Sequence, residues 1–186
     1  MLSDEQKKAL LKLARDSIKE EFTKERVELP ADDVFNERRG VFVTLHKEGS
    51  LRGCIGFPIA MHNLSQGILR AAKSAAFEDP RFDPLTEDEV DKLVIEISVL
   101  TVPEVIRVMD PKEYEENIKV GRDGLMVKSM DGAGLLLPQV FIEYDCDSIK
   151  AIEMTCQKAG LAKDAWKDLS VKVYKFEAEV FGEGAD

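Results

Sequence analysis

One order of elements occurs twice in this chain and restricts the folds that it can adopt: a β-hairpin, a loop that contains proline, and an amphipathic helix. The first copy spans about residues 41–77 and the second about residues 125–160. Hairpins separated by helices favour antiparallel sheets, because a parallel sheet requires single strands that alternate with helices. We therefore predict an α+β fold with mainly antiparallel sheets, packed helices and two related hairpin-plus-helix lobes.

Other elements follow from periodicity and from capping residues. A capping box at Ser3 opens an apolar pattern of helical spacing that reaches about Thr23. Runs rich in β-branched residues predict strands over 94–100 and 171–181. On the last strand, the residues expected to face the core are Tyr174, Phe176, Ala178 and Val180.

Length and composition agree with a single globular domain. The chain has 186 residues, of which 44% are hydrophobic, so it can bury a core without disulfides or a metal. We expect one domain over 1–186, with two intertwined lobes of about 1–120 and 121–186 as its internal division.

Charge and cysteine content exclude several classes of protein. The net charge of −10 disfavours nucleic acid and anionic membrane surfaces, both of which require a basic footprint. Cys54, Cys146 and Cys156 are odd in number and lack C-x-x-C spacing, which is typical of reduced thiols in a cytosol. The N-terminal residues lack the apolar run of a signal peptide, and the longest uncharged stretch, 53–69, is too polar to span a membrane. A cytoplasmic location is expected.

Motifs for common cofactors are absent from the sequence. It contains no Walker loop, dinucleotide fingerprint, zinc-ligand spacing or nucleophile elbow, and its only histidines are His46 and His62. No metal or cofactor is therefore predicted. One acidic cluster follows a second capping box at Thr86, and we interpret it as a solvated helix start: Glu87, Asp88, Glu89 and Asp91.

The segment 40–77 is positively charged in an otherwise acidic chain. It holds one acid, Glu48, against four cations: Lys47, Arg52, Arg70 and Lys73. Such a segment can activate the thiol of Cys54 or bind an anionic ligand. In the alternative reading, Arg70 and Lys73 form the wet face of a helix, which leaves Arg52 as the informative charge.

Arg52 and Cys54 are predicted on one face of their strand, because side chains alternate along a strand. Their partners depend on the length of the loop at Glu48-Gly49. The partners of Arg52 and Cys54 are Leu45 and Val43 for a two-residue loop, or His46 and Thr44 for a three-residue loop. The two-residue loop is the commoner hairpin, and in that register Cys54 packs as a small apolar residue.

Further candidates are residues that fit poorly in their local context. Gly53 and Gly56 weaken a strand, so a bulge, tight packing or a ligand close to the backbone must explain them. Glu96 interrupts an apolar strand and requires a partner such as arginine. Arg81 lies between two carboxylates in the rigid turn 79–84, where we expect hydrogen bonds that order the loop.

Five motifs together resemble one known family. They are Leu51-Arg-Gly-Cys-Ile-Gly56, Asp79-Pro-Arg-Phe82, Ile95-Glu-Ile-Ser-Val-Leu100, Gly134-Leu-Leu-Leu-Pro-Gln-Val140, and Lys158-Ala-Gly-Leu161 with Trp166. This set resembles the AMMECR domain family, named for a human chromosomal region linked to Alport syndrome, midface hypoplasia and elliptocytosis. The resemblance covers about residues 40–181, and the first motif is the specific signature of the family.

The resemblance implies an α+β protein with two related lobes and a cleft near the signature, but it implies no activity. Members of the family occur alone, or joined or adjacent to a Memo-like domain and a radical SAM protein, which makes these two the possible partners. The positions that carry over from the signature are Arg52, Gly53, Cys54 and Gly56, followed by Arg81 and Glu96.

Two functional hypotheses follow, and the sequence leaves open whether the protein is an enzyme. In the favoured one it is a binding or adaptor module, with a cleft at Leu51–Gly56 for a small anionic ligand or a partner protein. In the alternative it is a small-molecule enzyme or enzyme component, with Cys54 as nucleophile or redox thiol. Arg52 would then bind an anionic group, and Glu96 or His46 would act as acid or base.

Overall fold

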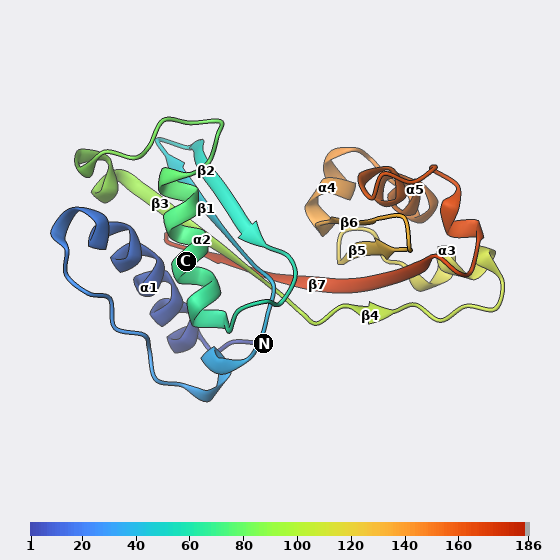
Figure 1. The fold of residues 1–186 in the computed structure, drawn as a ribbon, viewed down its shortest axis with the longest axis horizontal. Coiled ribbons are helices and arrows are strands. Elements are labelled where there is room, and N and C mark those ends of the chain that lie inside the picture. The colour runs from blue at the N-terminus through green and yellow to red at the C-terminus, as the bar shows by residue number, and fades with distance from the viewer. Residues whose placement is uncertain (185–186) are drawn as a thin grey trace. The chain divides into compact units, whose positions relative to one another are not determined.

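The computed structural model describes residues 1–184 and divides the chain into two compact units (Figure 1). Unit 1 consists of residues 1–100 together with the last stretch of chain from Glu179, and unit 2 consists of residues 101–178. Each unit combines helices with an antiparallel sheet, which confirms the predicted α+β class. The sequence prediction had placed a division near residue 120.

Unit 1 is a layer of helices on one face of a sheet. Its elements are α1 (Asp4–Thr23), η1 (Asp33–Asn36), β1 (Val41–Lys47), β2 (Ser50–Phe57), α2 (Leu64–Phe77), η2 (Glu87–Lys92), β3 (Leu93–Leu100) and the end of β7 (Lys172–Gly182). β1 pairs with β2 on one side and with β3 on the other, always antiparallel. Beyond β7, the backbone N–H of Glu183 donates to the carbonyl oxygen of Ile95 at 2.9 Å.

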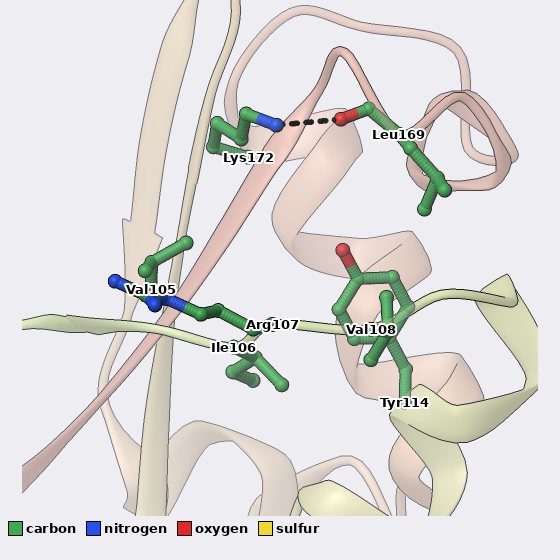
Figure 2. Close-up of a pocket in the computed structure, with 7 residues that line it drawn as sticks. All are labelled: Val105, Ile106, Arg107, Val108, Tyr114, Leu169 and Lys172. Carbon is green, nitrogen blue, oxygen red and sulfur yellow. Dashed lines mark hydrogen bonds between the residues drawn. The ribbon is translucent and has the colours of Figure 1, made fainter.

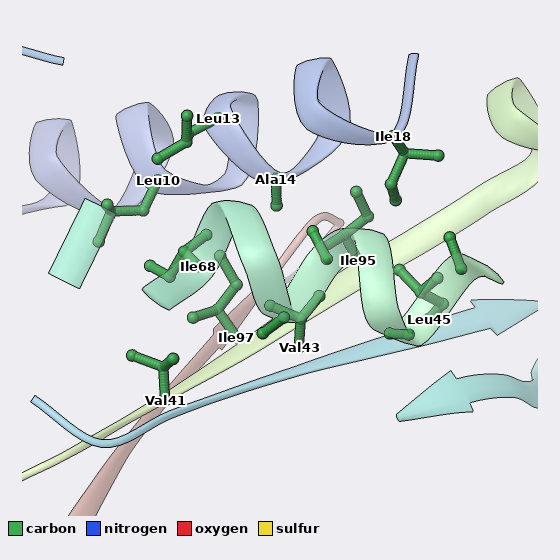
Figure 3. Close-up of a cluster of buried hydrophobic side chains, with 14 of the residues drawn as sticks. Leu10, Leu13, Ala14, Ile18, Val41, Val43, Leu45, Ile68, Ile95 and Ile97 are labelled. Carbon is green, nitrogen blue, oxygen red and sulfur yellow. The ribbon is translucent and has the colours of Figure 1, made fainter. Parts of the chain in front are cut away.

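The two faces of this sheet differ, because side chains alternate along each strand. Val43 and Ile97 are fully buried and belong to the core that α1 and α2 close, as Figure 3 shows. Thr44 and Glu96 point the other way and are half-buried. We call the face of β1–β3 turned away from α1 and α2 the outer face; it carries Phe42, Thr44, His46, Cys54, Gly56, Val94, Glu96 and Ser98.

Unit 2 has its own sheet and its own core. Its elements are β4 (Glu104–Val105), η3 (Pro111–Glu113), α3 (Tyr114–Asn117), β5 (Asp123–Lys128), β6 (Ala133–Leu136), α4 (Pro138–Glu143), α5 (Ser148–Lys158), η4 (Ala165–Lys167) and the first part of β7. β7 pairs with β4 and with β5, and β5 pairs with β6. Val127, Phe141 and Ile152 are fully buried in the core. The short helix α4 was not predicted.

The last strand corrects one prediction. Val173, which was not among the residues expected to face the core, is fully buried, whereas Val180, which was among them, is 49% exposed. Phe176 is buried as predicted, against Gly124, where a Cβ atom would lie 2.3 Å from its ring. No single set of alternating residues faces a core along the whole of β7, because the first part of the strand belongs to unit 2 and the last part to unit 1.

Each unit uses a glycine in the second strand of its hairpin to bring the following helix close. A Cβ atom on Gly53 in β2 would lie 2.1 Å from the carbonyl oxygen of Ala75 in α2, and one on Gly134 in β6 would lie 2.4 Å from the backbone nitrogen of Ala159 after α5. Real Cβ atoms do not approach backbone so closely, so both positions require glycine. The hairpin-plus-helix order that recurs in the sequence is thus accompanied in both units by a close contact between a strand glycine and the backbone of the helical segment that follows.

None of the helices in residues 1–184 combines the length and the apolar character that crossing a membrane requires.

The close approach of β2 and α2 makes Gly53→Ala a test of this packing. Because a backbone atom stands in the way, strand and helix must separate, and we expect a loss of about 2 kcal/mol in the free energy of unfolding. Urea unfolding of the full chain measures this loss. Ser50→Ala is the matched control, since Ser50 is exposed on the same strand. Equal stability of the two variants would contradict the packing argument.

Candidate functional site

The signature strand has a bulge that the sequence did not reveal. Glu48 and Gly49 both have positive φ, 52° and 76°, which makes the two-residue turn that was predicted. The register then shifts by one residue, because Leu45 pairs with Gly53 while its neighbour His46 pairs with Leu51. The extra residue is Arg52, which has no partner on β1.

The bulge changes the surroundings of the thiol. Cys54 lies opposite Thr44 and not opposite Val43, so the predicted pairing is wrong although the predicted turn length is right. The side chain of Cys54 therefore points to the outer face and not into the core. There the Thr44 hydroxyl donates a hydrogen bond to the Cys54 Sγ at 3.3 Å.

Arg52 is bound by a buried carboxylate. Its Nε and Nη2 donate to the two oxygens of Glu89, at 3.1 and 2.9 Å, in the forked geometry that suits a guanidinium and a carboxylate. Lys47 Nζ donates to the same carboxylate at 2.8 Å, and the backbone N–H of Thr86 does so at 3.0 Å. The interpretation of the acidic cluster as solvated is wrong for Glu89, which is only 9% exposed.

A second carboxylate, that of Asp79, binds the backbone of the signature strand. Asp79 Oδ2 accepts a hydrogen bond from the backbone N–H of Cys54 at 2.9 Å, and Arg81 Nη2 donates to the carbonyl oxygen of Cys54 at 3.2 Å. Arg81 also forks onto Asp79, at 2.9 and 2.7 Å. We call this arrangement of Asp79 and Arg81 the edge clamp, because it satisfies the outward polar groups of an edge strand.

Both carboxylates are held in their charged form. Hydrogen bonds from Arg81 keep the pKa of Asp79 well below its usual range, although burial opposes the shift. Hydrogen bonds from Arg52 and then from Lys47 lower the pKa of Glu89 in the same way, and the Glu89 carboxylate raises the pKa of Arg52. These groups remain ion pairs throughout the physiological range of pH.

The outer face carries two predicted residues, Cys54 and Glu96, in one row. Thr44 pairs with Cys54 on one side and with Glu96 on the other, so the three side chains form a row across β2, β1 and β3. No histidine or carboxylate side chain of residues 1–184 hydrogen-bonds to the Cys54 Sγ. The row therefore contains a thiol and a carboxylate separated by a threonine.

The remaining predicted residues have structural partners. The ring of Phe42 lies over Gly56, where a Cβ atom would come within 2.3 Å of it, and Gly53 is packed against α2. Of the four cations in 40–77, Lys47 and Arg52 bind Glu89, and Lys73 binds Glu20 and Glu21. The positive segment is largely neutralised within the chain.

Sequence reasoning missed the role of Glu89 and the contact between Asp79 and Cys54, and it gave Thr44 as the partner of Cys54 only for the less favoured three-residue loop. The capping box of Thr86 and Glu89 was visible in the sequence and drew attention to Glu89. The ion pair between Glu89 and Arg52 was not visible there. Within the described part of the chain, no group of three or more His, Cys, Asp or Glu side chains has the arrangement of a metal site.

These features define a class: α+β proteins of two hairpin-plus-helix units, with a glycine-bearing signature strand held by two carboxylate–guanidinium pairs. The AMMECR1 family model matches residues 11–181, so the chain belongs to the AMMECR1 family.

Several similar proteins come from archaea. A protein from Methanothermobacter thermautotrophicus is 45% identical over 185 residues, which cover 98% of this chain and 96% of the relative. A protein from Methanocaldococcus jannaschii is 50% identical over 153 residues, covering 81% and 76% of the two chains. The crystal structure of an uncharacterized protein from Pyrococcus horikoshii superposes with a TM-score of 0.84 at 45% identity, covering 98% of this chain and 94% of the other.

The edge clamp predicts a specific pH dependence of stability. The pKa of Asp79 is lower in the folded chain than in the unfolded one, so its contribution is complete above about pH 4 and is lost as the pH falls further. Asp79→Asn keeps an acceptor for the Cys54 N–H but loses the charge, and we expect it to cost about 2 kcal/mol at pH 7. The cost should shrink toward pH 2.

Unfolding by urea at pH 7, 4 and 2.5 measures this difference between the wild type and Asp79→Asn. Asp131→Asn is the control, since Asp131 is exposed and its carboxylate is not in an ion pair within residues 1–184. A cost that stays constant over this range of pH would show that the charge of Asp79 is not what stabilises the clamp.

Proposed function

We propose that this protein is a non-catalytic binding module whose outer face binds a partner protein. The observation that carries the proposal is that both guanidinium groups of the signature region, those of Arg52 and Arg81, already bind carboxylates of the same chain. The motif is therefore used to fix a surface rather than to hold a substrate.

An anionic substrate would have to displace a buried carboxylate to reach Arg52. The side chains of Arg52 and Glu89 are only 16% and 11% exposed. Removing one partner of such a pair leaves the other buried and uncompensated, which costs about 3–5 kcal/mol. This cost argues against anion binding at Arg52. Arg81 differs, because its own side chain is 53% exposed although that of its partner Asp79 is only 2% exposed.

The surroundings of Cys54 also favour a binding role over catalysis. A catalytic thiol is activated by an adjacent base, typically within hydrogen-bond distance. The Cys54 Sγ accepts its hydrogen bond from the hydroxyl of Thr44, which is not a base at neutral pH. Glu96 belongs to the same row but is separated from Cys54 by the whole width of β1.

The outer face has the character of a protein-binding surface. It is held by three paired strands and by the edge clamp, so its side chains are presented in fixed positions. Val94 on this face is 46% exposed, and polar groups of Thr44 and Glu96 lie beside it. The association of the family with Memo-like and radical SAM proteins makes these the first partners to test.

Titration calorimetry of the full chain against each purified protein, Memo-like and radical SAM, tests the proposal. We expect one of them to bind with a dissociation constant of about 10 μM or tighter, and we expect Thr44→Arg to weaken binding at least tenfold by placing a large charge in the middle of the outer face. Lys8→Glu, a change of charge at an exposed position on the helical side, should leave affinity unaltered.

Unfolding curves of each variant separate a lost surface from a lost fold, and Glu96→Lys serves as a second probe if Thr44→Arg is unstable. The proposal fails if neither protein binds, or if Thr44→Arg and Lys8→Glu weaken binding equally.

The reactivity of Cys54 distinguishes the binding module from an enzyme. Since the thiol is half-buried and hydrogen-bonded to Thr44, we expect iodoacetamide to alkylate it more slowly than free glutathione at pH 7.5. Mass spectrometry of peptides from the folded chain measures the rate, with Cys54→Ser as the blank. Alkylation of Cys54 faster than that of glutathione would favour a nucleophilic or redox enzyme instead.

A further inference from the structure

Unit 2 contains a cavity that is unrelated to the signature strand. Its volume is about 380 Å³, which lies within the range of small-molecule sites. Its apolar walls include Val105, Val108 and Leu169, and its polar lining consists of Arg107, Lys172 and Tyr114 (Figure 2). All of these residues belong to the one compact unit.

Positive charges lie opposite one another beside this cavity. Lys172 on β7 pairs directly with Lys128 on β5. On its other side β7 pairs with β4, and the N–H of Ile106 donates to the carbonyl oxygen of Val173 at 2.8 Å, so the pairing continues past Val105. The same register places Arg107 opposite Lys172.

Like charges directly opposite one another on adjacent strands are destabilising, and a bound anion would relieve this repulsion more fully than the nearby carboxylate of Asp168 does. Unlike Arg52 and Lys47 in unit 1, none of the three has a carboxylate within 4 Å in the part of the chain that the structure describes. Within residues 1–184, Lys172 Nζ donates only to the carbonyl oxygen of Leu169, at 2.9 Å. The arrangement is unusual in a chain of net charge −10.

Tyr114 supplies an unused hydrogen-bond donor at the same place. The residue as a whole is only 2% exposed, but its hydroxyl is not one of the enclosed polar atoms without a partner, which in residues 1–184 are Trp166 Nε1 and Glu179 Oε1. Burial raises the pKa of Tyr114, so the hydroxyl keeps its proton. Figure 2 shows the ring rising from α3 with its hydroxyl directed toward the segment that carries Leu169. The hydroxyl is therefore open to the cavity that Tyr114 lines and can donate a hydrogen bond to a molecule bound there.

We propose that this cavity binds a small organic anion, with its carboxylate or phosphate group at Arg107 and Lys172 and its apolar body against Val105, Val108 and Leu169. The Tyr114 hydroxyl donates a hydrogen bond to the bound molecule. The proposal is independent of the partner-binding role of the outer face, because the two sites belong to different units and share no residue.

Four probes, titrated into the full chain and followed by NMR shifts of backbone amides, test the chemistry of the cavity. 4-Phenylbutyrate and phenyl phosphate carry the two kinds of anionic group, 4-phenylbutanamide is the uncharged analogue, and inorganic phosphate lacks the apolar body. We expect at least one organic anion to bind saturably with a dissociation constant of about 1 mM or below, and the amide and inorganic phosphate to bind at least tenfold more weakly.

Variants then assign the binding to the cavity. Arg107→Ala and Lys172→Ala should each lower the affinity for the organic anion about tenfold. Tyr114→Phe, which keeps the ring, should lower it about fivefold. Lys163→Ala removes an exposed charge elsewhere in unit 2 and should have no effect. The tighter of the two anions identifies the ligand as a carboxylate or a phosphate.

Three results would overturn the proposal. They are no saturable binding of either organic anion, binding of the uncharged amide as tight as that of the organic anion, or the same loss of affinity in Lys163→Ala as in Arg107→Ala. Urea unfolding of Tyr114→Phe shows whether a loss in that variant reflects the missing hydroxyl or a damaged core. None of these results bears on partner binding by the outer face.

Discussion

The carboxylate of Asp79 holds the outward backbone of the signature strand at Cys54. β2 lies at the edge of its sheet, so the N–H and the carbonyl of Cys54 point away from β1 and need partners. Asp79 and Arg81 supply these partners from a turn. The polar groups of Cys54 are then no longer available to pair with a strand of another chain. Because the backbone is held on both sides, the thiol is fixed on the outer face. The Asp-Pro-Arg turn and the Arg-Gly-Cys strand are therefore parts of one structure.

Local sequence rules predicted much of the fold, because most elements here depend on neighbours in the chain. The capping box at Ser3, the two-residue turn at Glu48-Gly49 and the strand 93–100 all follow from residues within one or two turns of each other. The short helix α4 was missed since its six residues are too few to show a helical period.

The site was harder to predict than the fold, because its contacts are distant in the sequence. The bulge at Arg52 moves Cys54 from Val43 to Thr44, and Arg52 is bound by Glu89, 37 residues away. A capping box and an isolated arginine each have an ordinary local explanation, and only the folded chain joins them. For the same reason the strand alternation that placed Arg52 beside Cys54 failed at the one residue where alternation is interrupted.

The two units use their cations in opposite ways. In unit 1 the positive charges near the signature form ion pairs with carboxylates of the same chain, and these pairs hold that region in place. In unit 2 Arg107 and Lys172 face each other across strands without a carboxylate within 4 Å in the described chain. A motif search directs attention to the first region, because its residues are distinctive, whereas the second consists of common residues that only the register of β4, β5 and β7 aligns.

Unit 1 is discontinuous in sequence, and this has a consequence for its synthesis. The side chain of Glu183 binds Arg15 of α1 and accepts a hydrogen bond from the backbone N–H of Ile95 at 3.0 Å. Every residue of unit 2 leaves the ribosome before Glu183 does, although α1 emerges first. The fold of unit 1 is therefore completed only after all of unit 2 has been synthesised. During that interval the N-terminal part of unit 1 lacks its last contacts, and chaperones have their longest opportunity to bind it.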